Sequence, residues 1–157
     1  MKRFFRFLFA MAASFLPGII GVMFTPHGQS DPWYNMLNKS VLTPDGWVFA
    51  AVWPILYALL GIALFLVINN DRTRYSKTKA YLLFLSQMTL NALWTYMFFG
   101  LHLIGGAFLV SVLLLFIAIW MARAFYPISK HASYLVWPYI IWLVFALYLN
   151  GMILFMN

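Results

Sequence analysis

Long apolar stretches separated by short polar segments make up most of this chain. Each stretch has about 18 residues or more, the length that a helix rising about 1.5 Å per residue needs to cross a hydrocarbon core of about 30 Å. Strands of membrane barrels are shorter and alternate in polarity, whereas these stretches are continuous. The pattern predicts an all-α integral membrane protein, a bundle of five transmembrane helices. The expected helices cover residues 7–24, 47–68, 80–99, 104–122 and 134–155.

The basic residues support the same number of helices. If the helices run alternately up and down, nine of the ten Lys and Arg side chains fall on one side and only Lys39 falls on the other. Short loops rich in Lys and Arg stay in the cytoplasm. We therefore expect a cytoplasmic N-terminus, and the charge bias favours a bacterial inner membrane. The basic side holds Lys2, Arg3, Arg6, Arg72, Arg74, Lys77, Lys79, Arg123 and Lys130.

The composition excludes a soluble domain. Of the 157 residues, 65% are hydrophobic and 8% are charged, too few polar side chains to cover a surface in water. The formal net charge of +7 comes from residues that flank the apolar stretches and do not form one face. We therefore expect contact with the anionic headgroups of the lipid bilayer and no binding of nucleic acid. No repeat or second domain is visible, so residues 1–157 are expected to form a single transmembrane domain.

The first apolar stretch has features of a secretory signal peptide. Ala10-Met11-Ala12 resembles a cleavage site. Only about four apolar residues precede it, however, whereas the apolar core of a signal peptide has roughly 7–15. We therefore expect the first helix to remain uncleaved.

The longest expected connection is residues 25–46, which are rich in Pro, Gly, Asn, Asp and Ser. Loops longer than a connection requires often form lids or binding elements. Two interpretations of this connection are open, and both concern Trp33, Tyr34 and Trp47. These residues form an aromatic belt at the membrane surface, or the loop folds back as a cover over the helix ends.

The third expected helix carries a row of polar side chains. Gln87, Asn91 and Thr95 recur every four residues, and Trp94 and Phe98 lie on nearly the same face. Polar groups inside a bilayer should point into the bundle. There they form hydrogen bonds with another helix, or they contact a ligand.

Two further helices bring aromatic and small residues to a similar depth. Trp53 and Tyr57 are one turn apart in the second helix, and Trp142 and Ala146 are one turn apart in the fifth. Most of these candidates lie about 8–14 Å below the outer helix ends, and Trp142 lies deeper. Aromatic rings with a few hydrogen-bonding groups suit a flat apolar ligand, although simple packing between helices is the alternative. The candidate ligand-binding residues are Trp53, Tyr57, Asn91, Trp94, Phe98, Trp142 and Ala146.

The sequence lacks a conventional catalytic constellation. The acidic residues Asp31, Asp45 and Asp71 all fall in loops, so no paired carboxylates lie within an expected helix. His27 and His102 fall in outer connections, but their spacing forms no metal motif. Cysteine is absent, which excludes disulfides and thiolate sites. We expect no metal site.

Four groups of residues resemble the motifs of one membrane protein family. They are Trp33-Tyr34 with Thr43-Pro44, Trp53-x-x-Leu56-Tyr57, Asn91-Ala92-Leu93-Trp94, and Trp137-Pro138-Tyr139-x-x-Trp142-x-x-Phe145-Ala146. They occur in order over nearly the whole chain, and the combination is specific. The chain is therefore similar to the TspO/MBR family, the tryptophan-rich sensory proteins that include the mitochondrial translocator protein.

The resemblance implies a five-helix bundle, commonly a homodimer, that binds porphyrins, haem and similar apolar small molecules. The pocket would lie in the outer half of the membrane, beneath the loop after the first helix. Bacterial relatives are tied to tetrapyrrole regulation or export, and some promote light-dependent porphyrin degradation. The family positions that line the pocket match Tyr34, Trp53, Asn91, Trp94, Trp142 and Ala146.

We therefore predict a membrane protein that binds protoporphyrin IX or haem as a ligand, requires no cofactor, and acts in tetrapyrrole sensing, transport or scavenging. The alternative is an enzyme that catalyses light-dependent oxidative degradation of protoporphyrin IX. In that case Trp53 and Trp142 are the catalytic residues that the resemblance implies.

The chain departs from the family pattern at two places. Residues 39–45 lack the proline pair and the tryptophan that are usual in the family loop, so the resemblance does not imply a rigid cover or a contact between this segment and the ligand. The cholesterol motif of animal relatives requires a basic residue after a tyrosine in the last helix. No basic residue follows Lys130, so we do not expect sterol binding.

Overall fold

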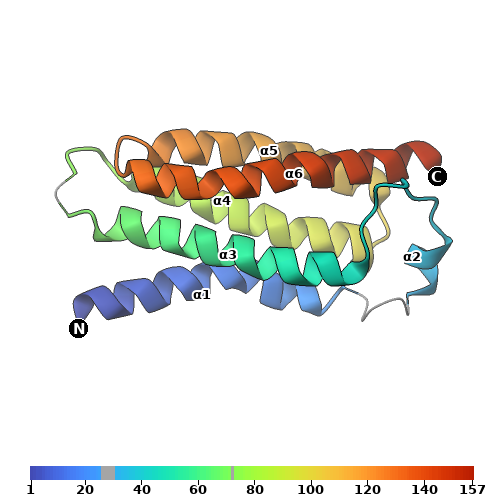
Figure 1. Cartoon of the computed structure of the whole chain (residues 1–157), viewed down its shortest axis with the longest axis horizontal. Helices are drawn as coiled ribbons and strands as arrows, with labels where there is room; N and C mark the ends of the chain where they lie inside the picture. Colours follow the sequence, from blue (N-terminus) through green and yellow to red (C-terminus); the bar gives the residue numbers. More distant parts are fainter. Residues whose placement is uncertain (26–30, 72) are drawn as a thin grey trace.

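Five long helices lie side by side in the computed structural model, which describes residues 1–25, 31–71 and 73–157 (Figure 1). Within these ranges the chain forms helices and no strand. The predicted all-α bundle of five helices long and apolar enough to cross a membrane is confirmed. The long helices are α1 (Lys2–Val22), α3 (Gly46–Asn69), α4 (Thr78–Thr95), α5 (Ile104–Phe125) and α6 (Lys130–Met156).

Two short elements adjoin the long helices at one end of the bundle. The helix α2 (Pro32–Met36) lies within the long connection and beyond the ends of α1 and α3 (Figure 1). The second element, η2 (Tyr96–Gly100), is a turn of π-helix that continues α4. Turns of this kind are frequent at functional sites. Neither element was expected from the hydrophobic pattern.

The helices extend beyond the apolar stretches that predicted them. The first begins at Lys2 instead of residue 7, and the last begins at Lys130 instead of residue 134. Long basic side chains can keep their charged groups at the membrane surface while their backbone is helical, so hydropathy alone places these boundaries too far inside. The start of α6 is fixed by Ser129, whose Oγ accepts a hydrogen bond from the Ala132 amide.

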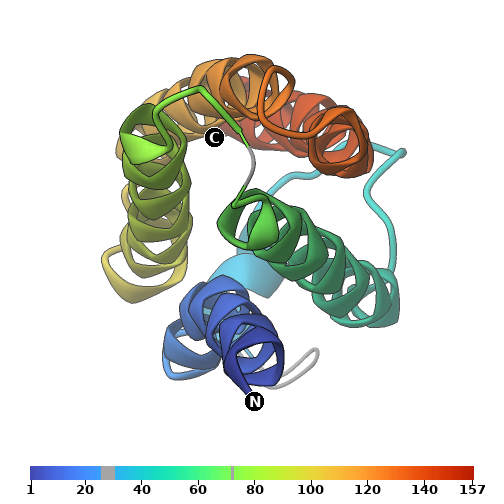
Figure 2. The ribbon, with the colours of Figure 1, turned by 90° about the vertical axis from the view of Figure 1, so that its left-hand side faces the viewer.

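In the end-on view, α1 lies below α3 and α4, and α5 and α6 close the opposite side (Figure 2). Gly61 of α3 allows a close approach of α1. A Cβ atom at this position would lie 2.7 Å from the Ser14 Oγ and 3.3 Å from the Met11 Cα. Small residues have this role in membrane bundles, where association depends on close packing.

Basic residues gather at the end of the bundle that holds the N-terminus. Arg6 of α1 and Asp71, between α3 and α4, form an ion pair of 2.7 Å there. Of the nine basic residues predicted to share one side, Arg72 lies outside the described residues.

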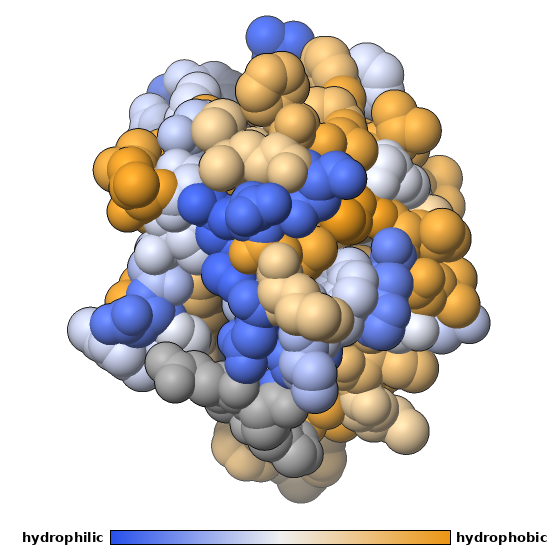
Figure 3. Space-filling model, turned by 90° about the vertical axis from the view of Figure 1, so that its right-hand side faces the viewer, coloured by the Kyte–Doolittle hydropathy of each residue, from blue (hydrophilic) through white to orange (hydrophobic). Residues whose placement is uncertain are grey.

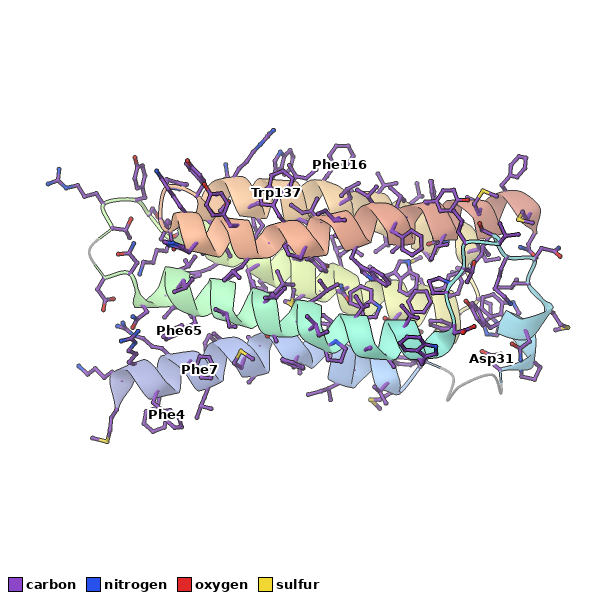
Figure 4. All side chains as sticks on the ribbon, in the orientation of Figure 1. Phe4, Phe7, Asp31, Phe65, Phe116 and Trp137 are labelled. Carbon is purple, nitrogen blue, oxygen red and sulfur yellow. The ribbon has the colours of Figure 1, made fainter. Side chains whose placement is uncertain are left out.

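Large apolar side chains cover the outside of the bundle. Phe116 is 57% exposed and Trp137 is 51% exposed, and both point away from the helices (Figure 4). In water such a surface would drive association, whereas in a bilayer it is the expected contact with lipid tails.

Candidate functional site

A network of uncharged hydrogen-bonding side chains joins α3, α4 and α6 inside the bundle. The Tyr57 hydroxyl donates to the Asn91 Oδ1 at 2.8 Å, and the Asn91 Nδ2 donates to the Tyr139 hydroxyl at 2.9 Å. The same hydroxyl accepts a bond of 2.7 Å from the Gln87 Nε2. All four residues are buried. The expectation that the polar row of the third helix points into the bundle is therefore confirmed.

A second network lies nearer the end of the bundle that carries α2. The Trp94 Nε1 donates to the Asn150 Oδ1 at 3.0 Å, and the Ser111 Oγ donates to the same oxygen at 3.2 Å. Asn150 is only 2% exposed, yet its Nδ2 has no partner. These bonds join α4, α5 and α6.

Aromatic rings pack around the second network. Trp94 and Phe98 stack with ring centroids 5.2 Å apart and planes 10° apart. Tyr34 contacts Phe98 and Phe99 at 6.3 Å and 5.8 Å. Three of the predicted ligand-binding residues, Tyr34, Trp94 and Phe98, thus come together at this end, although they belong to different elements.

The long connection folds back over this aromatic cluster. Trp33 of α2 stacks on the His102 ring at 3.9 Å and contacts Phe98 edge to face at 5.4 Å. Of the two interpretations of the loop, the cover therefore applies to Trp33 and Tyr34. Trp47 is 70% exposed, which agrees with an aromatic belt for that residue alone.

Local capping fixes the shape of the cover. The Asp31 carboxylate accepts hydrogen bonds from the amides of Trp33 and Tyr34, at 2.9 Å and 3.3 Å, and so caps the start of α2. The Lys39 Nζ donates to the Tyr34 carbonyl at 2.6 Å and lies 4.4 Å from the centre of its ring. Partial burial raises the pKa of the Tyr34 hydroxyl, so the phenol keeps its proton at neutral pH.

Hydrogen bonds also fasten the cover to the last turn of α6. The Asn38 amide donates to the Asn157 Oδ1 at 3.0 Å, and the Asn157 Nδ2 donates to the Asn38 carbonyl at 3.0 Å. The Ser40 Oγ lies 3.1 Å from the Tyr148 hydroxyl. These bonds join residues 38–40 of the loop to α6 and to the residue that follows it. Hydrophilic residues gather at the middle of this end of the molecule, with hydrophobic residues around them (Figure 3).

The two candidate catalytic tryptophans belong to α3 and α6, and each contacts an aromatic ring of the other helix. The Trp53 ring is 5.5 Å from Tyr57 and 6.3 Å from Tyr139, and so borders the first network. Trp142 packs against Phe49 and Phe145 at 5.7 Å and 5.5 Å. Its Nε1 is buried without a hydrogen-bond partner. Ala146 is half-buried one turn beyond Trp142.

Two hollows in the bundle lie away from these residues. The larger, about 1070 Å³, is a groove along α1 and α4. The smaller, about 730 Å³, lies between α4 and α5 at the basic end. None of the eight predicted ligand-binding residues lines either hollow. Among the described residues, no group of three or more His, Cys, Asp or Glu side chains is placed to hold a metal ion. His27 lies outside that part of the chain.

Sequence reasoning missed Tyr139, which is the shared hydrogen-bond partner of Gln87 and Asn91. The signal that could have revealed it is the polar row itself, because two buried amides in a membrane require partners on a facing helix. In the sequence, Tyr139 lies only five residues after the start of the expected fifth helix at residue 134. The true helix begins four residues earlier, at Lys130, so Tyr139 lies deeper than that boundary suggested.

Several known proteins are similar to this chain over most of its length. A model of the TspO/MBR family matches residues 9–156. The tryptophan-rich protein TspO of Archaeoglobus fulgidus is 36% identical over 141 residues, which cover 89% of each chain. The tryptophan-rich sensory protein of Cereibacter sphaeroides is 34% identical over 92% of this chain and 86% of its own. The translocator protein of Bos taurus is 31% identical over 86% of this chain and 80% of its own.

Proposed function

Since this chain belongs to the TspO/MBR family, we propose that it binds protoporphyrin IX, haem or a related tetrapyrrole beneath the α2 cover. The ligand-binding residues in this proposal are Tyr34, Trp53, Tyr57, Asn91, Trp94, Phe98, Trp142 and Ala146. Binding would serve tetrapyrrole sensing, transport or scavenging, with the N-terminus in the cytoplasm and the cover on the outer side of a bacterial inner membrane.

The observation that carries the proposal is that three buried polar atoms of α4 and α6 have no hydrogen-bond partner. They are the Trp142 Nε1, the Asn150 Nδ2 and the Gln87 Oε1. Leaving such a group unpaired costs about 1–3 kcal/mol. A ligand with polar atoms at its edge would supply the missing hydrogen bonds, which a purely apolar ligand would not.

The aromatic residues suit the flat part of such a ligand. Trp94 and Phe98 present nearly parallel ring faces, and a macrocycle gains from stacking on faces of this kind. Lys39 is the one Lys or Arg among the described residues at the cover end. Its ammonium group already lies at the cover, so a propionate of the ligand would meet its charge there.

The proposal is tested by titrating purified protein with protoporphyrin IX in the dark while tryptophan fluorescence is recorded. Saturable quenching is expected, with weaker affinity in Trp142→Phe, which removes the unpaired Nε1, and in Asn91→Ala, which disrupts the first network. Trp137→Phe is the matched control, because that ring points outward. Equal affinity in all four proteins would contradict the proposed site.

Illumination of the same samples tests the alternative, an enzyme that degrades protoporphyrin IX oxidatively. New absorbance bands that form in light and require Trp53 and Trp142 would favour the enzyme. Saturable quenching without a spectral change would leave a binding protein. Flux of protoporphyrin IX into sealed vesicles would identify transport.

A further inference from the structure

The larger of the two hollows described above runs along the outside of the bundle. It is lined by residues of α1 from Lys2 to Ile20, a distance of about 27 Å along the helix axis. Residues of α4 form the other wall, and Leu64 and Ile68 of α3 also line it. Its volume of about 1070 Å³ slightly exceeds the roughly 300–1,000 Å³ of ligand pockets. We call this hollow the α1–α4 groove.

The walls of the α1–α4 groove are apolar and face the bilayer. Phe9 is 65% exposed, and Phe5, Leu16 and Leu85 are more than half exposed. The α1 helix presents only Ala10, Ser14, Pro17 and Gly21 to the protein interior. Lipid tails are as apolar as these side chains, so an apolar groove alone does not select an occupant from the membrane.

The charged residues at one end of the groove favour an anionic occupant. Lys2 and Arg6 line this end together with Tyr81. Arg6 forms an ion pair with Asp71 and also donates to the Asn69 Oδ1 at 3.5 Å. Lys77 acts electrostatically on the same aspartate. Two cations, Arg6 and Lys77, thus act on the Asp71 carboxylate. Lys2 adds a further positive charge to the lining of the groove, so the net charge at this end of the groove is positive.

We propose that the α1–α4 groove binds one anionic phospholipid from the leaflet at the basic end of the bundle. Its phosphate contacts Lys2 and Arg6, and its acyl chains lie between α1 and α4. The charge also decides against a second copy of the chain as the occupant. A two-fold pairing through this groove would place the Lys2 and Arg6 groups of both copies close together, and like charges repel.

The headgroup is tested by native mass spectrometry of the purified full chain with equal amounts of phosphatidylglycerol and phosphatidylcholine of identical chains. Retention of one phosphatidylglycerol is expected. Lys2→Gln should lower its retention about five-fold, because a basic residue near an anionic lipid surface contributes about 1 kcal/mol. Lys130→Gln removes an equal charge from the same end but outside the groove, and it should have no effect.

The acyl chain site is tested with two Phe substitutions on α4. Thr89 is exposed and lines the groove, whereas Ser86 is exposed on the same helix and does not. Thr89→Phe should abolish lipid retention, and Ser86→Phe should retain it. Equal retention of both lipids, equal loss in Lys2→Gln and Lys130→Gln, or retention in Thr89→Phe would overturn the proposal. A dimer that Thr89→Phe dissociates would also overturn it, in favour of a second copy.

Discussion

The Tyr57 hydroxyl and the Asn91 side-chain oxygen lie 2.8 Å apart and join α3 to α4 by a hydrogen bond in the buried part of the bundle. Asn91 passes the connection on to Tyr139 of α6 through its Nδ2. One asparagine therefore links three helices. Because no water competes for these groups within the hydrocarbon region, they depend on one another for partners.

Removing the Tyr57 hydroxyl should destabilise the bundle by a modest amount. In Tyr57→Phe the Asn91 Oδ1 loses its donor, and interhelical hydrogen bonds in membrane proteins average about 0.6 kcal/mol, with a maximum near 1.7. We expect the free energy of unfolding to fall within that range. Unfolding in increasing fractions of sodium dodecyl sulfate measures the change. Tyr134→Phe, at an exposed ring, should leave the stability unaltered.

An added methyl group at Gly61 should separate α1 from α3. The new Cβ would lie 2.7 Å from the Ser14 Oγ and 3.3 Å from the Met11 Cα, and a backbone atom cannot turn aside as a side chain can. Overpacking typically costs about 1–3 kcal/mol, so Gly61→Ala should lower the thermal midpoint. Gly46→Ala is the control, since no atom lies within 4 Å of its Cβ position. Equal midpoints for both variants would show that α1 is not closely packed there.

The ion pair between Arg6 and Asp71 should make stability depend on pH in the acid range. The hydrogen bond from the Arg6 guanidinium, followed by its charge, lowers the pKa of the Asp71 carboxyl below its ordinary value of 3.8. At pH values above the pKa of this carboxyl in the unfolded chain, the lowered pKa in the folded state stabilises the folded protein. That contribution is lost as the pH falls through the lowered value.

We therefore expect the thermal midpoint of the native chain to fall more steeply than that of Asp71→Asn when the pH is lowered through the carboxylate range. The difference should be small and should shrink in high salt, because the pair is exposed and screened. Asp45→Asn, at a carboxylate that makes no capping hydrogen bond, should follow the native curve. A native curve parallel to that of Asp71→Asn would show that the pair does not form in the membrane.

Loosening the cover should expose its backbone. In Asn157→Ala the two hydrogen bonds between Asn157 and the Asn38 backbone are lost, and each hydrogen bond is worth about 0.5–1.5 kcal/mol. Amide hydrogen exchange in residues 33–40 should become roughly ten-fold faster. Met156→Ala keeps the backbone carbonyl that Asn38 contacts and should exchange at the native rate. Unchanged exchange in Asn157→Ala would mean that other contacts hold the cover.

Hydropathy and charge could predict the five helices and the inward direction of Gln87, Asn91 and Thr95, because a bilayer penalises exposed polar groups wherever they occur. The same signals could not distinguish Phe84, which is buried, from Phe5, which is exposed. Both lie in apolar surroundings before and after the helices associate. The rotation of each helix, and therefore the α1–α4 groove, follows from packing that one sequence does not reveal.

The part of the candidate site that lies on one helix could be predicted from the spacing of its residues. Trp94, Phe98 and Asn91 share a helix face, so their spacing places them together. The contacts of Tyr34 depend on the capping of α2 by Asp31 and on the π-helical turn that continues α4. These are local backbone features with weak signatures in the sequence. The hydrogen bonds between Asn38 and Asn157 join residues that are 119 positions apart.

The contact between the cover and Asn157 has a practical consequence for anyone who produces this protein. A purification tag fused after Asn157 would begin beside the loop over the proposed ligand site. A bulky tag there would weaken the two hydrogen bonds between Asn157 and Asn38. Affinities and uptake rates measured on such a fusion would then include an effect of the tag on the loop. A cleavable tag, removed before any ligand is added, avoids this confusion.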